Sequence, residues 1–296
     1  MSGPDKARGW WVERPHPRTT RIHLEGPPSA TWCRWFLLRS DAHHDNRHCR
    51  RDVEHRHLQE AEERDAIILD CGDLFCAMQG KWDKRADPTS LRDEYRLNYL
   101  DSLVREAAAL YEPYAHRWAL MSPGNHETSI RKRHETDLTE RLVTTLNERT
   151  GSTIQKGDYA GWIQIRLHFP NAERGRCGTF RIAYHHGYGG GGAVTKGTIQ
   201  SNRRRAMLRD YDLEWMGHIH ESWVHRDVVE GLASSGRPMY QDVFSLRTPG
   251  YKDEWSGGNG WHVERGAPPK PIGAWWMKLE WCFRLGRLVP TFEEAR

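Results

Sequence analysis

Residues 66–73 read AIILDCGD, and this stretch indicates the fold class of the chain. The apolar run at 66–69 has the length of a buried strand, and aspartates and a glycine follow it directly. Four further segments show the same arrangement of an apolar run followed by polar residues. They lead into SDAH at 40–43, GNHE at 124–127, HHG at 185–187 and GHIH at 217–220. The sequence therefore places a polar cluster behind each of five predicted strands.

Helices are predicted between several of these strands. The expected strands lie at 32–38, 66–69, 118–121, 162–169, 180–184, 213–216 and 274–282, and the expected helices at 47–64, 93–111, 138–146 and 197–210. Alternation of this kind predicts an α/β sandwich, with mixed central β-sheets flanked by helices. In open sheets of this class, sites form outside the carboxyl ends of the strands. The five polar clusters are expected at such ends.

The 296 residues are expected to form one catalytic domain between two short terminal segments. Residues 1–30 carry five prolines and scattered charge, which predicts an extended N-terminal arm. The domain itself is placed at 31–285, and 286–296 is expected to be a C-terminal tail. No internal repeat is found.

Composition excludes several classes of protein. No apolar run approaches the ~18 residues of a membrane span, and the first thirty residues lack the apolar segment of a signal peptide. Lys plus Arg number 44 against 40 Asp plus Glu, so the net charge of +4 does not by itself indicate a nucleic-acid binder. Six cysteines without a CxxC pair favour a reducing compartment, and a cytoplasmic location is expected.

The residue types in the clusters suit a divalent metal. Asp, His and Asn are ligands for borderline ions such as Mn, Fe, Co, Ni or Zn. In Asp-x-His and His-x-His, alternate side chains of an extended segment lie on the same side and can reach one ion. The candidate ligands are Asp41, His43, Asp73, Asn125, one of His185 and His186, His218 and His220. Seven ligands exceed one tetrahedral site but suit two ions that share a carboxylate.

The ordered set Asp-x-His, Gly-Asp, Gly-Asn-His-Glu, His-Gly and Gly-His-x-His resembles the calcineurin-like metallophosphoesterases over about residues 32–225. The resemblance implies a dinuclear centre whose metal-bound hydroxide attacks phosphorus. Mn²⁺ is the preferred ion, with Fe, Zn, Ni and Co as alternatives. The resemblance further implies that Asp41, His43 and His220 hold one ion. Asn125, His186 and His218 would hold the other, with Asp73 as the bridge and catalytic His126 just outside.

Two departures from the family pattern are visible. Relatives often carry Asp or Asn three residues after the Gly-Asp aspartate, where it can orient the histidine of Gly-Asn-His. Here that position is Cys76, so the partner of His126 is open. The run GDLFCAMQG at 72–80 disfavours the protein Ser/Thr phosphatase branch, and its first four residues resemble the Mre11/SbcD nucleases.

Several residues have alternative interpretations. Of the adjacent pair His185 and His186, the second is favoured as the ligand, which leaves His185 beside the ions or facing substrate. The basic run Arg203, Arg204 and Arg205 is either a solvated helix face or a rim that grips phosphate.

The function expected from the sequence is metal-dependent hydrolysis of a phosphate ester, with a nucleotide or nucleic acid among the candidate substrates and no membrane partner. One alternative is a DNA phosphodiesterase or exonuclease of repair or phage type. Another is a non-catalytic module that binds phosphate or nucleic acid.

Overall fold

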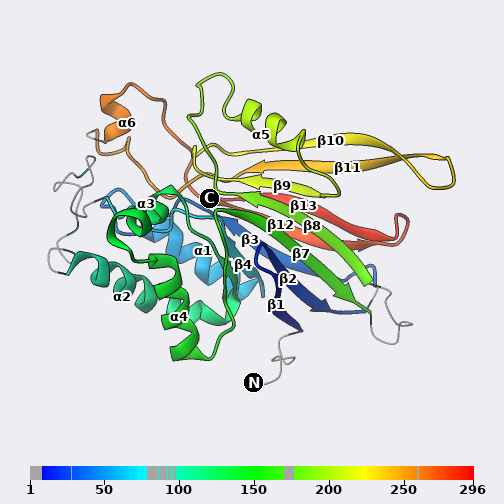
Figure 1. Ribbon diagram of the computed structural model, residues 1–296, viewed down its shortest axis with the longest axis horizontal. Coiled ribbons are helices and arrows are strands. Elements are labelled where there is room, and N and C mark those ends of the chain that lie inside the picture. The colour runs from blue at the N-terminus through cyan, green and yellow to red at the C-terminus, as the bar shows by residue number, and fades with distance from the viewer. Residues whose placement is uncertain are drawn as a thin grey trace.

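The computed structural model describes residues 9–27, 29–78, 98–169, 177–258 and 260–296, together with residues 86, 92 and 95. Two mixed sheets pack face to face, and helices cover the outer face of one of them (Figure 1). This arrangement confirms the predicted α/β sandwich. Among the described residues, no helix is both long and apolar enough to cross a membrane.

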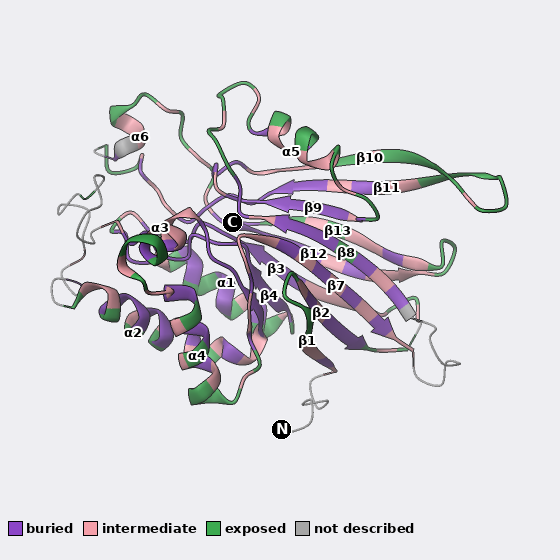
Figure 2. Cartoon of the chain, in the orientation of Figure 1, coloured by how far each residue is buried: buried purple, intermediate pink, exposed green. Residues whose placement is uncertain are grey.

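The larger sheet has seven strands in the order β1-β2-β7-β8-β9-β11-β10. Along the chain they are β1 (Trp10–His16), β2 (Thr19–Glu25), β7 (Ala160–His168), β8 (Cys177–His185), β9 (Leu213–Met216), β10 (Trp223–Leu232) and β11 (Pro238–Arg247). β8 and β9 run parallel, so their carboxyl ends lie at the same edge. The hairpin β10–β11 extends away from the body, and its outer part is exposed (Figure 2).

The smaller sheet has six strands in the order β13-β12-β3-β4-β5-β6. They are β3 (Cys33–Arg39), β4 (Ile67–Asp70), β5 (Trp118–Met121), β6 (Gln155–Lys156), β12 (Ala274–Cys282) and β13 (Arg287–Ala295). β3, β4, β5 and β6 are mutually parallel, whereas β12 and β13 are antiparallel additions. The carboxyl ends of β3, β4 and β5 therefore share one edge.

Helices α1, α2 and α4 pack on the smaller sheet. The helices are α1 (Arg51–Glu63), α2 (Tyr99–Tyr111), α3 (Asn125–His134), α4 (Leu138–Thr150), α5 (Thr198–Arg205) and the short α6 (Trp261–Glu264), with a 3-10 turn η4 at Glu112–Arg117. The segment expected as a helix at 197–210 ends at Arg205. His57 lies in a stretch expected to be solvated, but it is buried and its Nδ1 lies 3.0 Å from the Tyr251 hydroxyl.

The alternation of side chains along the strands divides the core in two. Phe36 and Leu38 of β3 point into the space between the sheets, whereas Leu37 points toward the helices. Ile67 and Ile68 of β4 divide in the same way. Both faces of this sheet are thus buried, which explains why its strands read as continuous apolar runs.

Most of the described residues in the two terminal segments belong to the sheets, and this corrects the expected arm at 1–30 and tail at 286–296; residues 1–8 and 28 lie outside the described residues. β1 and β2 form a hairpin around a turn at Pro17, and β2 lies beside β7 with Ile22 and Leu24 fully buried. β13 pairs with β12 over its whole length. The prolines therefore mark a turn, and the alternating apolar residues behind it are the evidence for a strand.

A buried ion network lies beneath the loops that follow β3 and β4. The Arg39 guanidinium is fully buried and donates to Asp70 at 3.0 Å and to Glu54 at 2.7 Å. The other oxygen of Asp70 accepts the Gly72 N–H at 2.8 Å. The network thus connects helix α1 to the backbone just before Asp73.

Arg39→Met is expected to lower the free energy of unfolding by about 3–5 kcal/mol, because it leaves two carboxyl groups buried without their cation. The matched control is Arg149→Met, which removes an ion pair to Glu112 whose partners are 47% and 43% exposed. That change should cost less than about 1 kcal/mol. Urea unfolding measures the free energy of unfolding of both variants. Equal decreases in the two variants would contradict the stabilising role of the Arg39 network.

Candidate metal centre

The structure brings the five predicted polar clusters together at one edge. Backbone hydrogen bonds connect neighbouring loops within each sheet. The Asp41 N–H donates to the Gly72 carbonyl at 2.8 Å, and the Gly217 N–H donates to the His186 carbonyl at 2.9 Å. A third bond joins the sheets, because the His218 N–H donates to Oδ2 of Asp41 at 2.9 Å. The parallel order of the strands is what places these loops side by side.

A first group of side chains consists of Asp41, His43 and His220, whose nearest ligand atoms all lie within 4.8 Å of one another. The Oδ1 atom of Asp41 is buried without a hydrogen-bond partner, and it lies 3.4 Å from Nε2 of His220. Nδ1 of His220 is buried without a partner as well. Unpartnered buried atoms of this kind are costly unless something else binds them, so this group fits a cation.

A second group consists of Asp73, His186 and His218, again within 4.8 Å. The Nδ1–H of His186 donates to the Cys71 carbonyl at 3.0 Å. Its Nε2 consequently faces Oδ2 of Asp73 at 3.2 Å and Oδ1 of Asn125 at 3.0 Å. A histidine fixed by a backbone carbonyl at one nitrogen is the usual arrangement of a metal ligand. This donor set also fits a borderline divalent ion.

Five of the candidate ligands have strained backbones. Asp41, His43, Asp73, His218 and His220 have φ angles of 54°, 46°, 55°, 73° and 53°. Residues other than glycine rarely occupy this left-handed region, and such residues concentrate at functional sites. The strain falls on the residues selected from the motifs, which is independent support for a functional centre.

Three glycines allow the loops to approach each other closely. A Cβ atom on Gly124 would lie 2.1 Å from Oδ1 of Asp73, and one on Gly217 would lie 2.6 Å from Oδ2 of Asp41. Gly250, which the motifs did not indicate, would place a Cβ 2.8 Å from the Asp41 carbonyl. Any side chain at these positions would displace a candidate ligand.

Mutual electrostatics sets the protonation of the cluster. Burial raises the pKa of Asp73, but the imidazoles of His186 and His126 outweigh this and hold that pKa well below its usual range. Burial also opposes charge on His186, yet Asp73 raises the pKa of His186 to about 9. Burial, and then neighbouring histidines, lower the pKa of His43 and His218. These two rings are neutral at neutral pH and offer lone pairs, whereas an ion at His186 would displace a proton.

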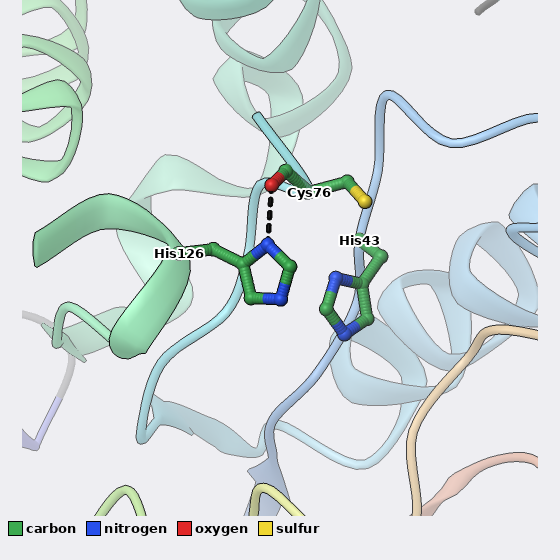
Figure 3. A group of neighbouring side chains, drawn as sticks. All are labelled: His43, Cys76 and His126. Atoms are coloured by element: carbon green, nitrogen blue, oxygen red, sulfur yellow. Dashed lines mark hydrogen bonds between the residues drawn. The ribbon is translucent and has the colours of Figure 1, made fainter. Parts of the chain in front are cut away.

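His126 is the second residue of helix α3, which begins at Asn125. Its backbone N–H donates to Oδ1 of Asp73 at 2.9 Å. Its Nδ1–H donates to the carbonyl oxygen of Cys76 (Figure 3), and its Nε2 lies 3.8 Å from Oδ2 of Asp73. The partner of His126 left open by the sequence is therefore the backbone at Cys76. Burial raises the pKa of the Cys76 thiol to about 12.

Of the adjacent histidines, His186 is the one that reaches the centre. His185 turns away, accepts the Gly187 N–H at 2.9 Å and packs its ring edge-on against Tyr159 and Tyr188. The alternation of side chains at the end of β8 accounts for this division.

The basic run on α5 divides as well. Arg205 donates to Asp227 at 2.6 Å, and Arg204 donates to the Tyr184 carbonyl at 3.2 Å. Arg203 is exposed to solvent. Arg204 and Arg205 therefore stabilise the fold. Of the three arginines, only Arg203 is exposed and could reach a substrate.

Sequence reasoning gave no role to several residues around the centre. Glu127 is buried and accepts the N–H groups of Phe75 and Gly124, both at 2.8 Å, which joins two of the motif loops. Its position three residues after the helix cap is a capping-box signal that could have identified it. Lys252 and Glu254 form an ion pair at 2.8 Å in a segment distant from every motif.

No protein-family model matches the sequence, and no curated protein matches it. Solved structures do. Vps29 from Entamoeba histolytica, crystallised with zinc, shares 10% identity at a TM-score of 0.35, covering 88% of this chain and 99% of that one. A metallophosphoesterase from Sphaerobacter thermophilus shares 14% identity at a TM-score of 0.34, with 88% of each chain covered. A predicted phosphoesterase from Streptococcus pneumoniae TIGR4 shares 9% at 0.32, covering 90% and 99%.

The chain is thus similar to a metallophosphoesterase and to a predicted phosphoesterase of known structure. Identities and TM-scores this low leave its activity to be inferred from its own side chains.

Proposed function

We propose that the chain is a metal-dependent phosphoester hydrolase with a dinuclear centre. One observation carries the proposal: two groups of Asp and His side chains lie side by side on four strand ends, with the buried Oδ1 of Asp41 lacking a hydrogen-bond partner. Asp41, His43 and His220 would hold one ion. Asp73, Asn125, His186 and His218 would hold the second, with Asp73 placed to serve both.

Divalent ions at these positions would neutralise phosphate oxygens and lower the pKa of water. The protein supplies position and proton transfer. Glu127 and the backbone at Cys76 fix the start of α3, so that Nε2 of His126 faces the space beside Asp73. From there it can donate a proton to a departing oxygen.

Five free cysteines among the described residues are consistent with the reducing, cytoplasmic location expected from the sequence.

A substrate screen tests the proposal directly. The purified protein, loaded with Mn²⁺, should hydrolyse para-nitrophenyl phosphate, its bis ester or single-stranded DNA, and chelation should abolish the activity. Preference for the bis ester and DNA would favour the phosphodiesterase alternative. A protein that binds two ions per chain and hydrolyses none of the three would support the non-catalytic alternative instead.

Arg203→Ala is expected to raise KM about two- to tenfold on single-stranded DNA, because an exposed guanidinium in the last turn of α5 attracts a polyanion. The KM for para-nitrophenyl phosphate should change less. Arg209→Ala is the matched control, since its side chain is 93% exposed and lies just beyond α5. Equal KM changes for both variants would mean that Arg203 belongs to a solvated helix face and does not bind substrate.

A further inference from the structure

A third group of potential ligands adjoins the centre, and it contains a cysteine. The ligand atoms of His43, Cys76 and His126 all lie within 4.8 Å of one another. Figure 3 shows the two imidazoles beside each other beneath the sulfur, with ring centroids 4.9 Å apart and planes at 78°. The motifs led us to expect at most a carboxylate here as a partner for His126. The residue present is a thiol.

The imidazole rings of His126 and His43 each have a nitrogen atom that is available to bind an ion. Because Nδ1–H of His126 donates to the Cys76 carbonyl, its Nε2 carries the lone pair that faces the group. His43 is 3% exposed, and its Nδ1 is buried without a hydrogen-bond partner. The two nitrogens of the His43 ring are distinct, so that one can face Asp41 and His220 while the other faces Cys76.

The loop that carries the sulfur is held in place. Nδ2 of Asn46 donates to Sγ of Cys76 at 3.3 Å, an interaction that favours negative charge on sulfur. Both oxygens of Asp45 are used on the backbone of the loop, accepting the N–H groups of Cys76 at 2.6 Å and Ala77 at 3.0 Å. Tyr99 donates to Asp45 at 2.8 Å from outside. Outer contacts of this kind orient the ligands of a metal site.

We propose that His43, Cys76 and His126 form a binding site for a thiophilic divalent ion, with Zn²⁺ as the first candidate. Two imidazoles and one thiolate match the ligand preference of zinc and leave a fourth position open. On binding, the Cys76 S–H bond breaks, a sulfur–zinc bond forms, and the proton passes to solvent. Where the other nitrogen of His43 already holds an ion, the His43 N–H proton passes to solvent as well, and the ring binds both ions as an imidazolate. His126, with a side chain 12% exposed, lies on the solvent side and gives the ion access.

Occupation of this site would also regulate the reaction. Nε2 of His126 cannot bind an ion and donate a proton at once, so zinc here would inhibit hydrolysis of esters with poor leaving groups. This consequence rests on the proposed function, whereas the binding itself does not.

Cobalt titration of the metal-free protein tests the binding. Co²⁺ takes zinc-like positions, and a bond to thiolate gives a sulfur-to-cobalt charge-transfer absorption in the near ultraviolet. We expect this absorption in the wild type and in the control Cys33→Ser. Cys76→Ser should lose it, with circular dichroism verifying the fold. Its absence from the wild type, or its survival in Cys76→Ser, would overturn the site.

A second variant keeps the test decisive if Cys76→Ser does not fold. His126→Gln should weaken cobalt binding, followed by the same absorption, by at least about tenfold. His186→Ala, which changes only the neighbouring group, should keep the absorption. Unchanged affinity in His126→Gln would contradict the proposed ligand set.

Inhibition is tested separately. Added Zn²⁺ should inhibit the Mn²⁺-loaded wild type at least about tenfold more strongly than Cys76→Ser on an alkyl phosphate ester. If the protein hydrolyses no ester but shows the cobalt absorption, the proposed function fails and the site stands. Equal inhibition of both variants would overturn the regulatory role alone.

Discussion

His126→Ala, loaded with Mn²⁺ alone, is expected to lose ~10²–10⁴ in kcat on an alkyl or nucleoside phosphate ester while the two ions of the proposed dinuclear centre stay bound. His126 is not a member of the two groups assigned to the dinuclear centre, so its removal should not release their ions. The loss arises because the alkoxide leaving group needs a proton as it departs. On para-nitrophenyl phosphate, whose phenolate leaves without help, the loss should be much smaller.

The measurement is kcat on both esters with metal content determined on the same samples. His134→Ala is the matched control, because it removes a histidine from the far end of the same helix. If His126→Ala slows both esters equally while the ions stay bound, His126 holds the phosphate or the nucleophile and is no general acid. Ions lost from the variant would instead show that His126 supports the centre itself.

Much of the candidate site could be predicted from the sequence because each of its parts is local. A buried strand followed by a turn is visible within about ten residues, and carboxyl ends of parallel strands must meet at one edge. Asp41, Asp73 and His218 could therefore be placed together from the sequence alone. The strain at these residues could not be predicted, because it depends on loops that press against each other from both sheets.

The edges of the sheets were the part that local patterns missed. Within the described residues, the arm predicted at 1–30 holds strands β1 and β2, and the tail predicted at 286–296 holds strand β13. β1 and β13 pair with strands that adjoin them in the sequence, whereas β2 also pairs with β7, which is far away in the sequence. The long hairpin β10–β11 was not predicted either, and its outer half is exposed although it carries apolar residues such as Val228, Leu232 and Tyr240. Strand pairing between distant segments leaves little trace in a single sequence when one strand is short or solvated.

Residues that act through the backbone were equally hidden. In the sequence, Cys76 occupies a position where relatives often carry a carboxylate. In the structure its backbone carbonyl oxygen orients His126, and any residue type would supply that oxygen. The buried ion network of Arg39 was missed because the three partners come from β3, β4 and α1. Such contacts become visible only when the elements are packed together.

Asp73→Asn should have the largest effect of any single substitution in the centre. The carboxylate lies 3.2 Å from Nε2 of His186, and its charge acts on His43 in the other group as well. Asparagine has the same shape, tolerates the left-handed backbone of φ 55°, and can still accept the His126 N–H. The substitution therefore removes charge and leaves the loop in place.

We expect the affinity for both ions to fall by more than ~10²-fold, since substitutions that only support a ligand already cost ~10–100-fold. Hydrolysis at limiting Mn²⁺ should fall by at least the same factor. His43→Ala should mainly empty the group with Asp41 and His220. Elemental analysis after dialysis gives both occupancies, and thermal unfolding verifies the fold.

Asp212→Asn is the matched control, because this largely buried aspartate stands at the opposite end of β9 from His218. It should keep both ions. Two ions retained at wild-type affinity in Asp73→Asn would mean that the centre is not built around this carboxylate. A loss confined to one ion would assign Asp73 to the group with His186 and His218 alone. Equal loss from both ions is the result expected if the two groups share this carboxylate as a ligand.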